Sequence, residues 1–206
     1  MLVKLGMKQN NKLIIGITGG SGSGKSVVSK AAESLGFIHI DTDKLGHQVI
    51  LKPNKAYYDL INTFGKVILN ENNEIDRKKL GDIVFSSPEK LELLNKIVHP
   101  AIVKKTKDML SDYTIIDGAV IYKTPEIMEL CDFIISVINS DERRIEFICK
   151  RDSIDELTAR KRIKSQPDND FYKSFADIVI ESDCELEDMF KKSVEVIKRC
   201  IGEKNI

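Results

Sequence analysis

The sequence predicts an α/β fold in which helices cover both faces of a five-stranded parallel sheet. Five short apolar runs rich in β-branched residues alternate with longer amphipathic segments, at residues 13–17, 37–40, 113–116, 133–137 and 178–180. Continuous apolar runs of this length, separated by helical patterns, are typical of buried parallel strands. A glycine-rich segment follows the first run directly and precedes a helical pattern. We therefore expect a three-layer α/β fold and one domain over residues 1–206.

The composition excludes several classes of partner. The chain has 206 residues, with 32 basic and 32 acidic side chains, and therefore no formal net charge. Such a balanced chain is a poor electrostatic match for nucleic acid or an anionic membrane, so we expect neither partner. No apolar run is long enough to span a membrane, and residues 1–12 lack the apolar segment of a signal peptide. The cysteines form no C-x-x-C pair, which favours reduced thiols and a cytoplasmic location.

Helix start signals define some of the segments between the strands. Ser153, with Glu156 three residues later, forms a capping-box pattern that predicts a helix over 154–165. The segment 185–200 carries apolar residues on one face and predicts an amphipathic closing helix.

Two helical excursions interrupt the strand–helix alternation. The first, at about 45–110, is far longer than a single crossover needs, and it contains Pro88 and Pro100 at favoured first-turn positions. These two prolines predict separate helices over 89–97 and 101–110. The second excursion, at about 143–175, is rich in charged residues. We expect a helical acceptor-binding insertion in the first excursion and a helical lid in the second.

Residues 19–26 read GGSGSGKS and match the phosphate-loop pattern G-x-x-x-x-G-K-[ST]. The glycines let the backbone curl so that its N–H groups point at phosphate oxygens, and the following helix N-terminus adds partial positive charge. In this pattern Lys25 reaches the β- and γ-phosphates of ATP, and the Ser26 hydroxyl is a ligand of Mg²⁺. The flanking strand and helix favour this reading over a flexible glycine-rich turn. We expect nucleotide contacts from Gly20, Gly22, Ser23, Gly24, Lys25, Ser26 and Val27.

The phosphate loop belongs to several enzyme classes, and the rest of the chain favours a small kinase. A GTPase would need the pattern N-K-x-D, but neither Asn-Lys pair, at 54–55 and 95–96, is followed by the required Asp. The chain is also too short for a large motor or transporter ATPase. We therefore expect a P-loop NTPase-type fold with an acceptor site and a lid.

Three acidic residues stand at or just after the ends of predicted strands, where α/β sheets bind ligands. Asp41 and Asp43 follow the second strand, and Asp117 follows the third. Phosphoryl transfer to a hydroxyl group requires one carboxylate near the acceptor oxygen and another near the metal. Asp43 has a compatible second role as the N-cap of a helix over 44–50, and Asp117 has the alternative of an ordinary strand-end residue. We expect Asp41 and Asp117, with Ser26, near Mg²⁺.

Six motifs occur in order along residues 13–181, namely GITGGSGSGKS at 16–26, DTD at 41–43, Arg77 with VF at 84–85, HP at 99–100, ARKRIKSQ at 159–166 and ADIVI at 176–180. Together they resemble the dephospho-CoA kinase family, which uses ATP and Mg²⁺ to phosphorylate the ribose 3′-hydroxyl of dephospho-CoA in the last step of coenzyme A biosynthesis. The resemblance implies a fold of the nucleoside-monophosphate-kinase type, with Asp43 as the catalytic base. It also favours Arg151 and Arg162 as clamps on the transferred phosphoryl group over solvated helix positions.

The chain departs from the family pattern near the predicted acceptor and lid sites. Lys123 replaces a Glu, Phe147 replaces a lid Arg, and Glu181 replaces an Asn. Arg144 stands where the family has Gln, and it or Arg143 is a candidate for the displaced lid cation, although a helix points both away from position 147. Two alternatives stay open: a related P-loop kinase with another nucleoside or nucleotide acceptor, or a non-catalytic nucleotide-binding protein. A monomer and a small homo-oligomer are both compatible with the sequence.

Overall fold

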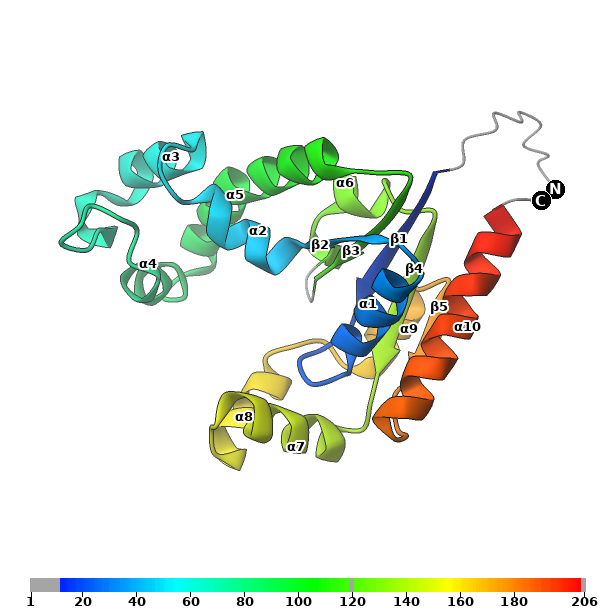
Figure 1. Cartoon of the computed structure of the whole chain (residues 1–206). Coiled ribbons are helices and arrows are strands. Elements are labelled where there is room, and N and C mark those ends of the chain that lie inside the picture. The colour runs from blue at the N-terminus through cyan, green and yellow to red at the C-terminus, as the bar shows by residue number, and fades with distance from the viewer. Residues whose placement is uncertain (1–11, 119–120, 205–206) are drawn as a thin grey trace.

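The computed structural model describes residues 12–118 and 121–204, and its strands form one fully parallel sheet (Figure 1). The strands are β1 (Leu13–Thr18), β2 (Ile38–Asp41), β3 (Tyr113–Asp117), β4 (Phe133–Ile138) and β5 (Ile178–Glu181). Their spatial order is β2-β3-β1-β4-β5, so β1 is central and the phosphate loop leaves the middle of the sheet. The predicted five-stranded parallel sheet is confirmed. The expectation for the N-terminal segment lies, apart from Lys12, outside the described residues.

Helices connect the strands in the order expected of an α/β fold. The α-helices of the described residues are α1 (Lys25–Ser34), α2 (Thr42–Val49), α3 (Lys55–Phe64), α4 (Arg77–Val84), α5 (Pro88–Met109), α6 (Pro125–Met128), α7 (Asp141–Asp152), α8 (Glu156–Lys164), α9 (Asn169–Ser174) and α10 (Leu186–Lys204). Two 3₁₀ turns also occur, η1 (Lys66–Ile68) and η2 (Ile121–Lys123). The closing helix predicted over 185–200 corresponds to α10.

Side chains of β1 alternate between two hydrophobic clusters, one on each face of the sheet. Leu13, Ile15 and Ile17 pack with residues of α1 and α10, which lie side by side on that face (Figure 1). Ile14 points to the opposite face and packs with Ile127 of α6 and with the end of α5. This period of two, with both faces buried, is the reason the strand reads as a continuous apolar run. The polar residues that line the site therefore lie at or beyond the carboxyl ends of the strands.

The segment between β2 and β3 is helical and has a hydrophobic cluster of its own. Tyr57, Leu60, Ile68 and Leu80 are buried in it, together with apolar residues of α2 and α5. These helices project beyond the β2 edge of the sheet, as Figure 1 shows. The excursion predicted at 45–110 is therefore helical, and its role in binding the acceptor stays a prediction.

The prediction of two separate helices at the two prolines is wrong. A single helix, α5, begins at Pro88 and continues through Pro100 to Met109. Proline lacks the N–H that would bond the carbonyl of Lys96, four residues earlier, and this normally kinks or ends a helix. Apolar residues on both sides of Pro100 pack into the same cluster, including Ile97 and Ala101. This shared packing holds the two halves of α5 together.

The capping box predicted at Ser153 is also wrong. Ser153 has φ 53° and ψ 42°, a left-handed conformation that ends α7. Helix α8 begins two residues later than predicted, because Asp155 is its N-cap and accepts a hydrogen bond from the N–H of Thr158 at 2.8 Å. Asp and Ser are similarly good N-caps, so the sequence pattern alone does not choose between them.

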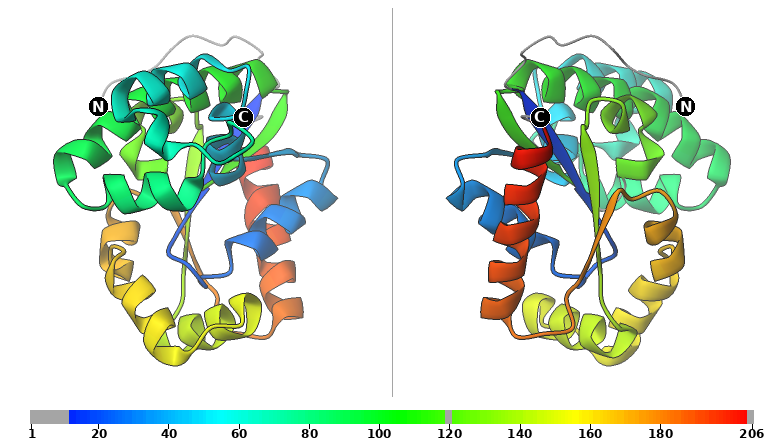
Figure 2. Two further views of the ribbon diagram at one scale, coloured as in Figure 1. Left: turned by 90° about the vertical axis from the view of Figure 1, so that its left-hand side faces the viewer. Right: turned by 90° about the vertical axis from the view of Figure 1, so that its right-hand side faces the viewer.

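The segment after β4 forms the helices expected of the second excursion. Helices α7 and α8 pack through a small cluster that includes Ile145, Ile148 and Ile163. They lie beside the phosphate loop at the carboxyl end of the sheet (Figures 1 and 2). The function of this segment as a lid stays a prediction.

Within the described ranges no helix is long and apolar enough to cross a membrane. The cysteines are all free thiols, as expected: Cys131, Cys149, Cys184 and Cys200.

Candidate active site

The phosphate loop connects β1 to α1 and depends on glycine at several positions. Gly19, Gly22 and Gly24 have φ values of 144°, 75° and 97°, in the region that favours glycine. A side chain at Gly19 would in addition collide with the backbone carbonyl of Val137 on β4. Gly24 is the N-cap of α1 and has no side-chain cap, so the first N–H groups of that helix remain available to an anion.

Lys25, the first residue of α1, has its ammonium group inside the loop. The Nζ atom donates hydrogen bonds to the carbonyl oxygens of Gly19 at 2.9 Å and Gly20 at 3.1 Å. Burial lowers the pKa of Lys25, while the nearby carboxylates of Asp117 and Asp43 oppose part of that shift. The lysine therefore lies within electrostatic reach of Asp117 at the end of β3 and of Asp43 in α2.

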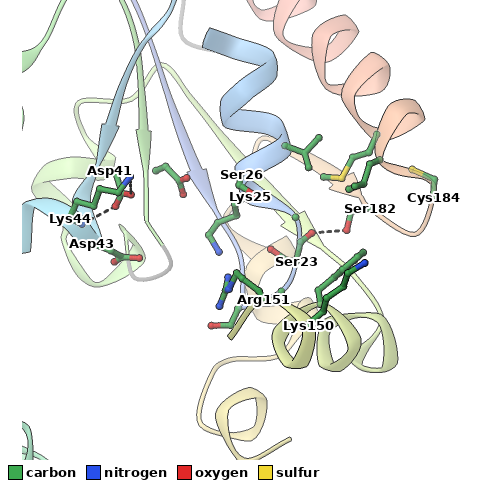
Figure 3. A pocket seen from close by; sticks show the side chains of 18 of the residues that line it. Ser23, Lys25, Ser26, Asp41, Asp43, Lys44, Lys150, Arg151, Ser182 and Cys184 are labelled. Atoms are coloured by element: carbon green, nitrogen blue, oxygen red, sulfur yellow. Dashed lines mark hydrogen bonds and ion pairs between the residues drawn. The ribbon is translucent and has the colours of Figure 1, made fainter. Parts of the chain in front are cut away.

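One cavity of about 580 Å³ opens beside the loop. Its phosphate end is lined by the loop itself, from Ser21 to Ser26, and by Asp41, Asp43 and Asp117. Arg151 and Lys150 of α7 line the opposite side. Figure 3 shows Lys25, Asp43 and Arg151 pointing into this cavity from α1, α2 and α7. The fold thus brings together residues that are more than a hundred positions apart in the sequence.

The three predicted acids have different environments. Asp41 is the N-cap of α2, because its Oδ1 accepts the N–H of Lys44 at 2.9 Å, and its Oδ2 lies 3.1 Å from Lys44 Nζ. Burial raises the pKa of Asp41, but its hydrogen bonds and ion pair with Lys44 prevail and lower it overall. Asp43 lies in the first turn of α2, so its predicted role as the cap belongs to Asp41. Asp117 ends β3, and its Oδ2 accepts a hydrogen bond from Ser29 Oγ at 2.9 Å.

The two predicted lid arginines share one carboxylate. Arg151 donates to Asp152 from Nε at 2.8 Å and from Nη2 at 2.9 Å, and Arg162 pairs with the same residue. Hydrogen bonds from Arg151 and Arg162 hold the pKa of Asp152 well below its usual range. Arg151 lines the cavity, whereas Arg162 does not. The structure therefore brings the first arginine to the site, and the catalytic role of the second stays a prediction.

The far end of the cavity is apolar, and the sequence did not directly indicate its residues as part of the site. Val27, Phe147, Leu186 and Met189 line it, with Cys184 at its edge. Leu186 and Met189 belong to the apolar face of the closing helix, which the sequence indicated as packing only. Phe147 is the aromatic residue that replaces the family's lid arginine. An apolar end next to a phosphate-binding end suits a nucleoside joined to phosphates.

Some predicted positions lie outside this cavity. Gly20 is in the phosphate loop but does not line the cavity, and its Cα faces Arg144 instead. Lys123 ends η2, with Nζ 5.6 Å from the ring centre of Tyr122, and Glu181 ends β5 with its carbonyl bonded to Lys192. Of the four departures from the family pattern, at Lys123, Arg144, Phe147 and Glu181, only Phe147 lines the cavity.

A parallel sheet of this order, a phosphate loop, and acids and an arginine around one cavity define a P-loop kinase. Among solved structures, protein TT1252 of Thermus thermophilus has the same fold, with a TM-score of 0.76, 23% identity, and coverage of 91% of this chain and 97% of that one. The dephospho-CoA kinase of Campylobacter jejuni gives a TM-score of 0.60 at 25% identity, covering 92% of this chain and 98% of that one.

The sequence comparisons are more specific. The dephospho-CoA kinase family profile matches residues 13–188. A dephospho-CoA kinase of Fusobacterium nucleatum is 42% identical over 185 residues, which cover 87% of this chain and 94% of that protein. The chain belongs to the dephospho-CoA kinase family. It is therefore a phosphotransferase that acts on small molecules, with ATP as a substrate and dephospho-CoA as the acceptor that becomes CoA.

Proposed function

We propose that the chain transfers the γ-phosphoryl group of ATP to the ribose 3′-hydroxyl of dephospho-CoA in the cavity between the phosphate loop, α2 and α7. One observation carries this proposal: Lys25, Asp43 and Arg151 come from three different elements and line the same cavity. Phosphoryl transfer through a loose transition state depends mainly on positioning and on neutralising charge. Two cations and an acid that line one cavity meet that requirement.

Each of these residues has a distinct role in the proposal. Lys25 and the loop N–H groups bind the β- and γ-phosphates, for which the buried, hydrogen-bonded ammonium is already directed toward the loop. Arg151 stabilises the charge on the transferring group from the lid side, and Arg162 supports it through Asp152. Asp43 accepts the proton from the acceptor hydroxyl. The apolar end of the cavity, with Phe147 and Met189, receives the adenine of ATP.

The donor groups beside Lys25 also fit Mg²⁺. This ion prefers oxygen ligands, takes one or two carboxylates, and completes its shell with phosphates and water. Ser26 and Asp117 offer such oxygens, and the described residues contain no cluster of three or more His, Cys, Asp or Glu side chains that would make a site independent of nucleotide. Bound Mg²⁺ would neutralise charge on the β- and γ-phosphates. Asp41 is the least available of the predicted ligands, because Lys44 engages both of its oxygens.

The remaining assignments follow from the layout of the fold. The helical insertion at 45–110 would bind the acceptor, because Asp43, Lys44 and His47 of α2 line the cavity on that side. The segment at 143–175 would act as the lid. A cytoplasmic monomer or small homo-oligomer without a nucleic-acid partner agrees with the free thiols and the zero net charge.

The test is ADP release from ATP and Mg²⁺, measured with and without dephospho-CoA. Wild-type protein is expected to release ADP only with the acceptor, and Asp43→Asn to lower that rate by about 10²-fold or more with little change in ATP affinity. Asp59→Asn is the matched control, because it removes a carboxylate of α3 that pairs with Lys55 at 3.5 Å and lies outside this cavity. Folded, ATP-binding wild-type protein without acceptor-dependent release would refute the proposal.

A further inference from the structure

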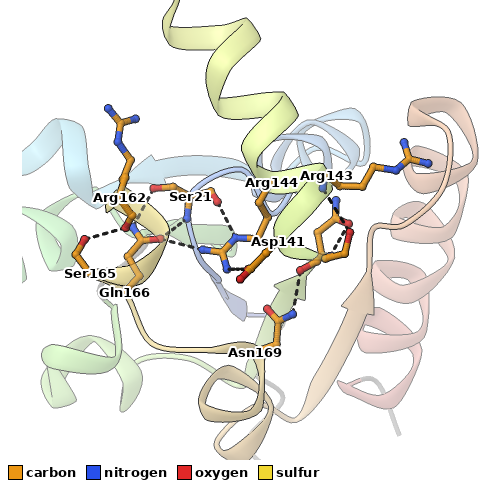
Figure 4. A network of polar contacts seen from close by, with 10 residues as sticks. Ser21, Asp141, Arg143, Arg144, Arg162, Ser165, Gln166 and Asn169 are labelled. Atoms are coloured by element: carbon orange, nitrogen blue, oxygen red, sulfur yellow. Dashed lines mark hydrogen bonds and ion pairs between the residues drawn. The ribbon is translucent and has the colours of Figure 1, made fainter. Parts of the chain in front are cut away.

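The tip of the phosphate loop is held by two side chains from the segment after β4. Arg144 of α7 donates from Nε to the carbonyl oxygen of Ser21 at 3.0 Å (Figure 4). Gln166, just after α8, accepts the N–H of Ser21 with Oε1 at 2.8 Å and donates from Nε2 to Ser21 Oγ at 2.9 Å. The backbone N–H, the backbone carbonyl and the hydroxyl of Ser21 are thus all bound by these two residues.

The two side chains that hold Ser21 also bind each other. Arg144 Nη2 donates to Gln166 Oε1 at 3.2 Å, and Nη1 donates to Asp141 Oδ1 at 3.0 Å. The Arg144 side chain is only 2% exposed, although it carries a full charge. A buried guanidinium is retained only where oxygen acceptors surround it, and removal of one partner leaves the others unsatisfied. This buried hydrogen-bond network is therefore a specific connection between the phosphate loop and the segment after β4, and not a chance surface contact.

The glycines on either side of Ser21 allow Arg144 to approach the loop closely, because they have no side chain. A side chain on Gly20 would collide with the guanidinium of Arg144, and a Cβ on Gly22 would lie 2.6 Å from the backbone oxygen of Arg144. Gly20 does not line the nucleotide cavity, so its small size serves the contact with α7 rather than a phosphate. The phosphate loop and α7 are packed so closely that neither can shift without the other.

We propose that Arg144 is a positioning residue for the phosphate loop, and that Arg144 and Gln166 join the lid to that loop. Arg144 does not line the cavity, so it acts through the backbone of Ser21. Fixing this peptide pre-sets the curvature that directs the loop N–H groups at phosphate, and it reduces the ordering cost of binding. This inference rests on the nucleotide-binding half of the proposed function and is independent of the acceptor.

The test is the affinity for ADP with Mg²⁺, measured by titration calorimetry on the full chain. Arg144→Ala is expected to raise the Kd about tenfold or more, and Arg144→Lys nearly as much, because an ammonium group cannot reproduce the guanidinium's fork of donors. Arg143→Ala is the matched control. Arg143 precedes Arg144 on α7 and pairs with Asp183 at 3.2 Å, away from the loop. The Kd of the Arg143→Ala variant for ADP should therefore change less than about twofold.

A double-mutant cycle separates positioning from general stability. Gln166→Ala should also weaken ADP binding, and the double variant should lose much less than the product of the two single losses, because both act through Ser21. If R144A fails to fold, R144K and Q166A carry the test. Folded R144K and Q166A proteins with wild-type ADP affinity, or losses that multiply independently, would overturn the inference. If wild-type protein does not phosphorylate dephospho-CoA but Arg144→Ala still weakens ADP binding, only the acceptor assignment is refuted.

Discussion

Ser29 Oγ on α1 donates a hydrogen bond of 2.9 Å to Asp117 Oδ2 at the end of β3. The Nε2 atom of His39 in β2 is 3.5 Å from the same carboxylate oxygen, and its Nδ1 atom is 2.9 Å from Glu33 Oε1. This contact with the Asp117 carboxylate raises the pKa of His39 against the effect of burial. Asp117 is therefore held in one orientation by neighbours on two elements, as expected of a carboxylate that contacts a metal ion.

Substitution of Asp117, or of the serine that orients it, should raise the Mg²⁺ concentration that the reaction requires. Asp117→Asn is expected to raise the Mg²⁺ concentration for half-maximal activity by about tenfold, and Ser29→Ala by about threefold, because the carboxylate loses its charge or its orienting donor. Mg²⁺ titrations of the kinase rate measure both. Ser34→Ala is the control, since the hydroxyl of Ser34 on the same helix bonds the carbonyl of Ala31 and not Asp117. An unchanged Mg²⁺ dependence in D117N would exclude Asp117 from the metal site.

The two lid arginines should differ in their effect on catalysis. Arg151→Gln is expected to lower kcat by about 10²-fold, because Arg151 lines the cavity and is the arginine that we propose stabilises the transferring phosphoryl group. Arg162→Gln should cost about tenfold or less, since Arg162 contacts Asp152 and lies outside the cavity. Steady-state rates at saturating ATP and acceptor measure the difference. Equal losses in the two variants would mean that Arg162 enters the site during turnover, as the sequence alone suggested.

Asp152 should make the stability of the protein depend on pH. Arg151 and Arg162 hold its folded-state pKa below the unfolded value of about 3.9. Its contribution is therefore present above that unfolded pKa and lost as the pH falls through the folded one. Asp152→Asn should unfold at lower urea concentration than wild type at pH 7, and the gap should narrow below about pH 4.

Asp170→Asn is the matched control for this pH effect, because Asp170 is largely exposed and its ion pair with Lys173, at 3.3 Å, is at the surface. Its urea midpoint should match that of wild type throughout the pH range. A gap between D152N and wild type that stays constant from pH 7 to pH 3 would contradict the explanation.

Cysteine labelling should report nucleotide binding. Burial raises the pKa of Cys131 to about 12 and that of Cys200 to about 11, so both stay protonated and slow toward iodoacetamide at pH 8. Cys184 lines the cavity, and near-saturating ADP should slow its alkylation about tenfold. Cys149 packs in the α7–α8 cluster and is the internal control. Peptide mass spectrometry distinguishes the sites, and equal protection of Cys149 and Cys184 would argue against a local effect.

The sheet and the phosphate loop could be predicted from sequence because their signals are local. β1 reads as an apolar run since both its faces are buried, and the Gly-Lys-Ser pattern fixes the loop that follows. Pro100 misled the prediction because the packing of α5 outweighs a missing hydrogen bond, and that packing involves residues distant in sequence. Propensity is a weak guide wherever tertiary contacts decide the outcome.

The candidate site was predictable in part for the same reason. Asp43 and Asp117 stand at strand ends, where a topological argument applies. The contact of Arg144 with Ser21 spans 123 positions, and nothing local distinguishes Arg144 from Arg143 beside it. Only the fold reveals that one of these arginines is buried under the loop while the other lies at the surface, paired with Asp183.

The most direct test of the account is the product formed from ATP, Mg²⁺ and an equimolar mixture of dephospho-CoA, adenosine and AMP. Mass spectrometry should find CoA as the main product, with one phosphate added to dephospho-CoA, and NMR should place that phosphate on the ribose 3′-oxygen. Faster phosphorylation of adenosine or AMP, or transfer to another position of dephospho-CoA, would contradict the central claim.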